Sequence, residues 1–177
     1  MVKKTAKFFS YFLFFILALV VFIPKSSLYY FMEQELETFN IIVSNETLKE
    51  NLLTLALKDA DISIKRVESA KIETTTLTLL VFYNHISFKN IQLSTLIEAY
   101  APSKIREIQL KYEIWNPFFI TMQGTGDFGS CVAKFNLQTK TMQVKFAPSK
   151  LMLEKYKNSL HYFKKSNTGE YVYAKNF

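Results

Sequence analysis

The sequence predicts a β-rich α+β protein: an N-terminal transmembrane helix, then one antiparallel sheet domain with a few short helices and a C-terminal amphipathic helix. The run from Phe8 to Ile23 carries no charge and follows a basic leader, as is typical of a membrane helix. From Asn40 onward, apolar residues recur with a period of two in runs rich in β-branched and aromatic residues, which favours strands. Only four glycines and four prolines occur in 177 residues, so we expect one domain without linkers.

The uncharged run is long enough to anchor the chain in a membrane. As a helix it spans about 24 Å, against a hydrocarbon core of about 30 Å. A cleaved signal peptide is the alternative, but residues 23–27 lack the spaced small residues of a cleavage site. We therefore favour an uncleaved anchor over residues 8–24. The side chains expected to anchor it are Phe8, Phe12, Phe15, Leu19 and Phe22.

Lysines at the two ends of the anchor predict its orientation. Only Lys25 follows the anchor closely, so the leader 1–7 is expected in the cytoplasm and the domain 41–177 on the other side. Arginine is rare among the 22 basic residues, which fits an AT-rich bacterial genome, and we expect a single-pass inner-membrane protein with a periplasmic domain. The leader lysines on which this orientation rests are Lys3, Lys4 and Lys7.

Composition restricts the class of partner. Hydrophobic residues make up 49% of the chain and aromatic residues 16%, which excludes a disordered tail. Without the three leader lysines, 19 basic residues face 15 acidic ones, so the excess of positive charge is mild and nucleic acid is not an expected partner. The lone cysteine, Cys131, forms no internal disulfide, and we expect it to be a buried thiol.

A juxtamembrane helix is predicted over residues 25–40. Ser26 or Ser27 is expected to cap it, and Lys25 to reach the membrane surface. Apolar residues recur in it at spacings of three and four, which predicts a stripe that packs on the domain. The stripe comprises Leu28, Phe31, Met32, Leu36 and Phe39.

The first half of the domain reads as a series of strands. Asp59 and Asp61 look like turn formers between two of them, and the alternation slips near Asn90, which indicates a bulge. Residues 44–50 are ambiguous between a strand and a helical turn. Strands are expected over 41–43, 53–57, 62–67, 71–83 and 85–93.

The second half continues this pattern with two helices. Thr95 and Glu98 form a capping box, which predicts a helix over 96–101. Pro148 and Ser149 are expected to open the amphipathic helix, which runs to about Lys165. The glycines of 124–129 lie between strands and predict a tight turn or bulge instead of a phosphate site. Strands are expected over 105–115, 118–123, 130–137, 141–146 and 171–173.

The sequence contains no credible active site. His85 and His161 are the only histidines, and neither has an acidic residue or a cysteine at metal-ligand spacing. A nucleophilic pair of Cys131 with a histidine is the alternative, but it lacks any flanking signature. We therefore expect no catalytic residue, no metal and no cofactor.

Positive charge gathers near the end of the chain. Eight lysines and the single acid Glu154 lie between Lys134 and Lys165. A basic amphipathic helix binds anionic lipid headgroups or an acidic partner, whereas the simpler interpretation is a solvated lysine face. The candidate surface comprises Lys150, Lys155, Lys157, Lys164 and Lys165.

One apolar sheet face is a candidate for binding. In LALKDADISIKRVESAKIETTTLTLLVFYNHISFKNIQLS and in GTGDFGSCVAKFNLQTKTMQVKFAPS the chain resembles AsmA-type periplasmic proteins and the type II secretion protein N family. That resemblance implies a strongly curved sheet whose inside carries alternate apolar residues, and a hydrophobic groove for lipid. The candidate face comprises Leu53, Leu55, Leu57, Leu80, Phe82, Ile86 and Phe88.

Three functions are open at this point. The first is a non-enzymatic structural or assembly component of a bacterial envelope machine, such as a secretion system or a flagellar motor, bound to other envelope proteins. The second is a short lipid-binding or lipid-transfer module. The third, an enzyme, requires clustered titratable groups that the sequence does not supply.

Overall fold

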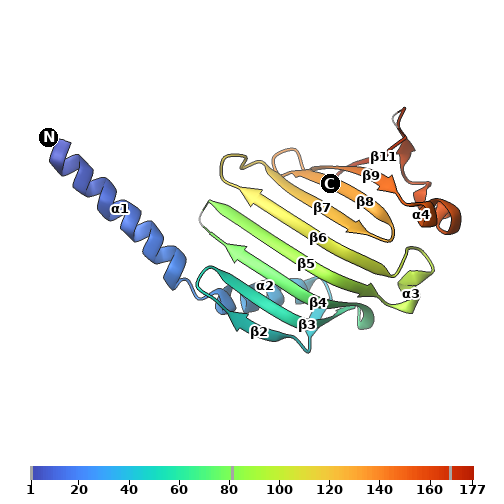
Figure 1. Ribbon diagram of the computed structural model, residues 1–177, viewed down its shortest axis with the longest axis horizontal. Coiled ribbons are helices and arrows are strands. Elements are labelled where there is room, and N and C mark those ends of the chain that lie inside the picture. Colours follow the sequence, from blue (N-terminus) through green and yellow to red (C-terminus); the bar gives the residue numbers. More distant parts are fainter. Residues whose placement is uncertain (1, 81, 168) are drawn as a thin grey trace.

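The computed structural model describes residues 2–80, 82–167 and 169–177, so Met1, Val81 and Thr168 lie outside the described residues. A long N-terminal helix extends away from a single broad sheet, and shorter helices lie at the two ends of the sheet (Figure 1). In chain order the elements are α1 (Val2–Phe22), α2 (Lys25–Thr38), β1 (Ile41–Ser44), β2 (Thr47–Glu50), β3 (Thr54–Ile64), β4 (Val67–Leu79), β5 (Tyr83–Leu93), α3 (Thr95–Glu98), β6 (Lys104–Glu113), β7 (Phe119–Gly126), β8 (Gly129–Asn136), β9 (Thr141–Pro148), α4 (Lys150–Lys155), η1 (Lys157–Leu160), β10 (Lys164–Lys165) and β11 (Tyr171–Asn176).

The sheet is a nearly continuous antiparallel meander of 11 strands. Its order is β1-β3-β4-β5-β6-β7-β8-β9-β11-β10, and β2 also pairs with β3. From β3 to β9 each strand pairs with the next one in the chain, so short turns suffice to connect them. The predicted β-rich class, the antiparallel sheet and the N-terminal apolar helix are thereby confirmed.

Helix α1 is apolar and contacts little else in the protein. Its segment Lys4–Phe22 is long and apolar enough to cross a membrane, with a mean hydropathy of 2.1, and 6% of that segment is buried. The predicted anchor residues Phe8, Phe12, Phe15, Leu19 and Phe22 all lie exposed on it. The side chains of Lys4 and Lys7 are exposed too, whereas that of Lys3 is outside the described part.

The N-cap of α2 lies two or three residues before the predicted serine cap. Pro24 occupies the N-cap, and the oxygens of the Glu50 side chain accept hydrogen bonds from the backbone N–H groups of Lys25 and Ser26. The expectation of a Ser26 or Ser27 cap is wrong, because a carboxylate from β2 satisfies the free N–H groups instead. Lys25 is 1% exposed, and its ammonium donates hydrogen bonds to the carbonyl oxygens of Val20 and Ile23 at the end of α1.

The buried face of α2 differs from the predicted stripe. Phe31 and Phe39 are 61% and 70% exposed, whereas Tyr29, which the stripe omitted, is 6% exposed. Only Met32 and Leu36 of the predicted stripe line the space against the sheet. The predicted stripe was wrong because a neighbouring face of the helix contacts the sheet, and Tyr29 lies at the centre of that face.

Strand β3 runs unbroken through the predicted turn at Asp59 and Asp61. Asp59 has a φ of 58°, and the pairing of β3 with β4 passes from Lys58 directly to Ala60. The register with β4 is the same on both sides of Asp59, so the strand continues through it and the expected turn is wrong; the register shift of this pair lies between Ile62 and Ser63. In β5 Asn90 has a φ of 54° at the predicted slip, but the pairing with β4 and β6 keeps its register across Asn90, so the predicted bulge is wrong.

The C-terminal amphipathic helix is much shorter than predicted. Ser149 caps α4 as expected, accepting a hydrogen bond from the Met152 N–H at 3.1 Å, but α4 ends at Lys155. The chain continues as the 3-10 turn η1 and the short strand β10, which pairs with β11. At α3, Ser94 takes the N-cap position without a side-chain bond, so the predicted capping box does not form.

Two separate hydrophobic clusters stabilise the domain. The first joins Tyr29 of α2 to Leu55, Leu57 and Leu77 of the sheet. The second lies at the other end of the sheet, where α4 and η1 pack on β9, and comprises Phe146, Met152, Tyr156 and Leu160. Between these clusters the middle strands have no helix over them in the described part of the chain.

Candidate functional site: the apolar face of the sheet

One face of the sheet is apolar from β3 to β9. Residues directly opposite each other on antiparallel strands lie on the same face. The register pairs Leu77 with Ile86, Phe88 with Ile108, Leu110 with Met122, and Ala133 with Val144. We define the apolar face by these residues and their same-face neighbours Leu55, Leu57, Ala60, Ile62, Ile72, Ile91, Ile105, Cys131 and Phe146.

The other face of the same strands is polar. Thr76 pairs with Ser87, which in turn pairs with Gln109. The Ser87 hydroxyl donates to a Glu107 carboxylate oxygen at 3.0 Å, and hydrogen bonds from Gln109 and Ser87 hold the pKa of Glu107 below its usual value. The sheet is thus polar on one side, which leaves the apolar face as the side that buries hydrophobic surface.

A first cavity of about 270 Å³ lies between α2 and the apolar face. Met32 and Leu36 close it from the helix, and Ile72, Leu77 and Phe88 line it from the sheet. Glu33 at its rim is the charged residue of this lining, and burial followed by the charges of Glu46 and Glu37 raises its pKa. The cavity is therefore apolar with a single acidic group.

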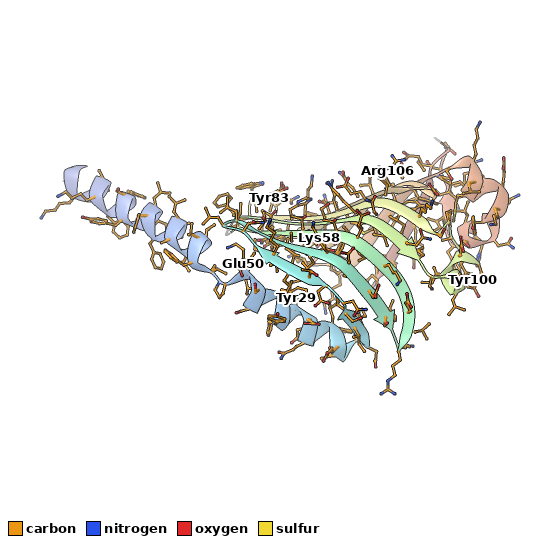
Figure 2. All side chains as sticks on the ribbon, turned by 60° about the horizontal axis from the view of Figure 1, so that its bottom comes forward. Tyr29, Glu50, Lys58, Tyr83, Tyr100 and Arg106 are labelled. Carbon is orange, nitrogen blue, oxygen red and sulfur yellow. The ribbon has the colours of Figure 1, made fainter. Side chains whose placement is uncertain are left out.

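Tyr29 fixes the position of α2 over this cavity. Its hydroxyl donates a hydrogen bond to Glu46 at 2.9 Å, and its ring belongs to the first hydrophobic cluster. Burial, together with the bond to Glu46, raises the pKa of Tyr29. In Figure 2, Tyr29 lies between α2 and the strands above it.

A second cavity of about 370 Å³ lies at the opposite end of the apolar face. The sheet contributes Ile108, Met122 and Val144 to its lining, and Phe163 covers it from the segment after η1. Tyr100, Ala101 and Pro102 border it beside α3, where the Ser159 hydroxyl donates to the Tyr100 carbonyl at 2.6 Å. Its lining contains no charged side chain among the residues that the structure describes.

The two cavities adjoin across β5 and β6. Phe88 lines the first cavity and Ile108 the second, and these residues are direct cross-strand partners. Leu110, Met122 and Val144 beside them are only half-buried. The result is a continuous apolar surface that α2 covers at one end and α4 with η1 at the other.

A polar hollow on the opposite face is a weaker candidate. It has a volume of about 440 Å³ and is lined by Glu73, Asn90, Lys104 and Arg106 among others. The Asn90 amide donates to the Glu73 carboxylate at 2.7 Å, so these groups already satisfy one another. The hollow lies beside the left-handed residue Asn90.

Four of the predicted apolar-face residues lie on the observed face: Leu55, Leu57, Ile86 and Phe88. Leu53, Leu80 and Phe82 lie instead beyond the strand ends, in the loops before β3 and after β4. Sequence analysis missed the contribution of β6 to β9, although the alternation of Ile108 and Leu110 carried the signal.

The predicted basic surface is spread over three elements. Its lysines are all exposed, but they do not lie on one helix, because the predicted helix ends early. They are Lys150 and Lys155 in α4, Lys157 in η1, and Lys164 and Lys165 in β10. The hypothesis of a basic amphipathic helix therefore loses its structural basis.

The side chains that could act in catalysis or bind a metal lie apart from one another. Cys131 is on the apolar face beside Gly124, its cross-strand partner in β7, and burial raises the pKa of the thiol. His85 is on the polar face, since its β5 neighbour Ile86 faces the cavity, and His161 is exposed after η1. Within the described residues no group of three or more histidine, cysteine or acidic side chains is placed to hold a metal.

Comparisons with known proteins give no match: no protein-family model, no curated protein and no solved structure is similar to this chain. The resemblance to AsmA-type proteins and to the type II secretion protein N family therefore stays a prediction. It rests on the alternation of apolar residues in the strands.

Proposed function

We propose that this chain is a non-enzymatic, single-pass protein of a bacterial inner membrane, and that its periplasmic domain binds the acyl chains of lipids on the apolar face. The observation that carries the proposal is the pair of adjoining apolar cavities on a sheet joined directly to a membrane-type helix. Acyl chains are the ligand class that such a surface buries most favourably, because they offer apolar area without polar groups that need partners.

The anchor is supported by the length and exposure of α1. Its span Lys4–Phe22 has 19 residues, which as a helix reach about 28 Å and match the hydrocarbon core of a bilayer. The lysines of the leader support an N-terminus in the cytoplasm, by the positive-inside rule. The sheet domain then lies in the periplasm.

The size of the cavities supports a slender ligand. Volumes of about 270 and 370 Å³ fall together within the usual range of small-molecule sites. A curved, trough-like sheet is part of the proposal, and the register shifts between Ile62 and Ser63 and between Ile105 and Glu107 support it, because β-bulges bend and twist the strands that contain them.

A partner protein is the competing occupant of the apolar face, in keeping with an assembly role in an envelope machine. The α2 end argues against it, because a helix of the chain itself covers the face there and leaves room only for a narrow group. We therefore favour lipid, and co-purification of a protein is an outcome of the test.

The test is photo-crosslinking of the full chain in vesicles that contain a phospholipid with a diazirine on its acyl chain. Peptides of α1 are the internal control, since a membrane helix crosslinks in any case. We expect additional crosslinks in peptides from β5 to β9. Crosslinks confined to α1, together with a stable protein partner from native membranes, would contradict lipid binding and favour assembly.

A matched pair of variants in β7 sharpens the test. Met122 lies on the apolar face, whereas its neighbour Gln123 is exposed on the polar face. Met122→Glu places a charge where an acyl chain is proposed to lie, and we expect it to abolish the sheet crosslinks. Gln123→Glu adds the same charge to the same strand and is expected to leave them intact.

A further inference from the structure

A cluster of exposed apolar side chains lies along one edge of the sheet, and we call it the aromatic edge. Trp115 is 66% exposed, Phe177 is 64% exposed and Leu52 is 63% exposed. Monomeric soluble proteins rarely expose a contiguous apolar patch of this kind unless it meets another surface. The aromatic edge comprises Leu52, Leu53, Phe82, Ile114, Trp115, Phe118, Leu137 and Phe177.

The antiparallel register brings these residues to the same edge. The start of β3 pairs with the end of β4, the start of β5 with the end of β6, and the start of β7 with the end of β8. The start of β9 pairs with the end of β11, and Phe177 follows that end. The loops that contain the exposed residues are therefore neighbours along one side, although they are far apart in the sequence.

The membrane-type helix joins the domain at this same edge. Glu50 at the end of β2 is the cross-strand partner of Leu55 and accepts the hydrogen bond from the N–H of Lys25, where α2 begins. In Figure 1, α1 extends away from the side on which β4 ends and β5 begins. Figure 2 shows Tyr83 at the side near α1 and Tyr100 at the far side.

The chemistry of the aromatic edge fits the boundary between headgroups and acyl chains. Phe82 and Trp115 are in ring contact at 6.1 Å between centroids. Lysines accompany the aromatic rings: the Lys175 ammonium lies 4.9 Å from the Phe177 ring, and Lys134 lies 3.7 Å from the Phe119 ring. Tryptophan is enriched at membrane interfaces, and lysines on the same edge fit that position because their ammonium groups reach the phosphates while the rings bury.

We propose that the aromatic edge inserts into the headgroup region of the bilayer that α1 spans, and so forms a second membrane contact. This inference rests on the proposed anchoring by α1 and does not depend on a lipid bound to the apolar face. The insertion holds the strand ends against the bilayer, so that the apolar face opens onto the lipid surface.

The test uses Trp115, which is the single tryptophan of the chain. The full chain is reconstituted into phosphatidylcholine vesicles, and its emission is measured with acyl-chain-brominated phosphatidylcholine and with aqueous acrylamide. We expect an emission maximum at shorter wavelength than in denaturant, strong quenching by lipid brominated near the ester end of the chain, and weak quenching by acrylamide. Strong acrylamide quenching without bromine quenching would overturn the proposal.

A matched variant moves the probe to the far edge. Trp115→Phe combined with Leu96→Trp places the tryptophan in α3, where Leu96 is 65% exposed and outside the lining of the second cavity. We expect acrylamide to quench this variant and brominated lipid to leave it unaffected. Equal bromine quenching of both probes would contradict insertion by one particular edge.

Two further measurements separate this proposal from the proposed function. A chain that does not float with the vesicles would contradict anchoring by α1, whereas a floating chain with an exposed Trp115 contradicts the aromatic edge alone. In Met122→Glu, which is designed to exclude lipid from the apolar face, bromine quenching of Trp115 is expected to persist. Its loss there would assign the quenching to lipid on that face and overturn insertion.

Discussion

Glu50 at the end of β2 receives a hydrogen bond from the backbone N–H of Lys25, at 3.0 Å between the nitrogen and the carboxylate oxygen. The second carboxylate oxygen accepts from the N–H of Ser26 at 3.2 Å and also from its hydroxyl. A sheet residue thus caps the helix that follows the anchor. This contact fixes the first turn of α2, which follows α1, to β2, and β2 in turn pairs with β3.

Replacing Glu50 by glutamine is expected to weaken this junction most at neutral pH. Hydrogen bonds from Ser26 and Lys25 lower the pKa of Glu50, so the folded state binds its proton less tightly than the unfolded state does. The stabilisation is present above the ordinary pKa and is lost as the pH falls through the lower, folded value. Thermal unfolding of the wild type and of Glu50→Gln should therefore converge in acid, whereas Glu170→Gln, a control in an exposed turn, should follow the wild type throughout.

Removing the side chain of Leu55 is expected to test the first hydrophobic cluster. Leu55 is 0% exposed, so Leu55→Ala leaves a cavity and is expected to lower the free energy of unfolding by about 2–5 kcal/mol. Leu52→Ala, at a residue 63% exposed, is expected to change it by less than about 0.5 kcal/mol. Denaturant unfolding measures both, and equal losses would show that the cluster is not where the domain gains its stability.

Tyr29→Phe is expected to weaken the attachment of α2 over the first cavity. The change removes the hydrogen bond to Glu46 and should lower the free energy of unfolding by about 0.5–1.5 kcal/mol. Because the pKa of Tyr29 is raised from its ordinary value of 10.0, its contribution is complete below that pH and is lost as the pH rises through the folded value. The wild type should therefore lose stability in alkali relative to Tyr29→Phe.

The matched control for this prediction is Tyr30→Phe, since Tyr30 is 51% exposed and adjacent in the same helix. Unfolding temperatures measured on both sides of the ordinary tyrosine pKa distinguish the two variants. If both behaved alike, the interaction of Tyr29 with Glu46 would not hold the helix.

Gly129 is expected to be irreplaceable in the turn that opens β8. Its φ is +115°, and a Cβ built there would clash with the Ala147 carbonyl oxygen. Gly129→Ala should lower the free energy of unfolding by more than about 1 kcal/mol, because the backbone conformation and the contact are both unfavourable. Gly169→Ala is the control: its φ is also positive, at +83°, but apart from its chain neighbours no atom of the described residues lies within 4 Å of a Cβ built there.

Much of the strand pattern was predictable because alternation of apolar residues is a local property. The slip at Asn90 shows this well: Phe88 and Ile91 both face the apolar side, and one left-handed residue between them accounts for the change of phase. Asp59 is also a left-handed residue within a strand, and the sequence analysis wrongly interpreted it as a turn. An aspartate in the left-handed region is compatible with either structure, and only pairing with β4 distinguishes them.

The helices were predicted less well because their ends depend on distant partners. The cap of α2 comes from Glu50, twenty-five residues away in the sequence, and no local pattern indicates it. The last helix stops at Lys155 because Tyr156 and Leu160 reach the second cluster through a 3-10 turn, and β10 then pairs with β11.

By itself the sequence determined the apolar helix, the β-rich class and the inward-facing residues of the early strands, because hydrophobicity and its period act over a few neighbouring residues. Only the tertiary structure decided that Leu53 and Phe82 leave the apolar face for the aromatic edge, and that Phe88 and Ile108 join two cavities. Both outcomes depend on strand register, which is set by contacts between segments that the chain brings together only when it folds.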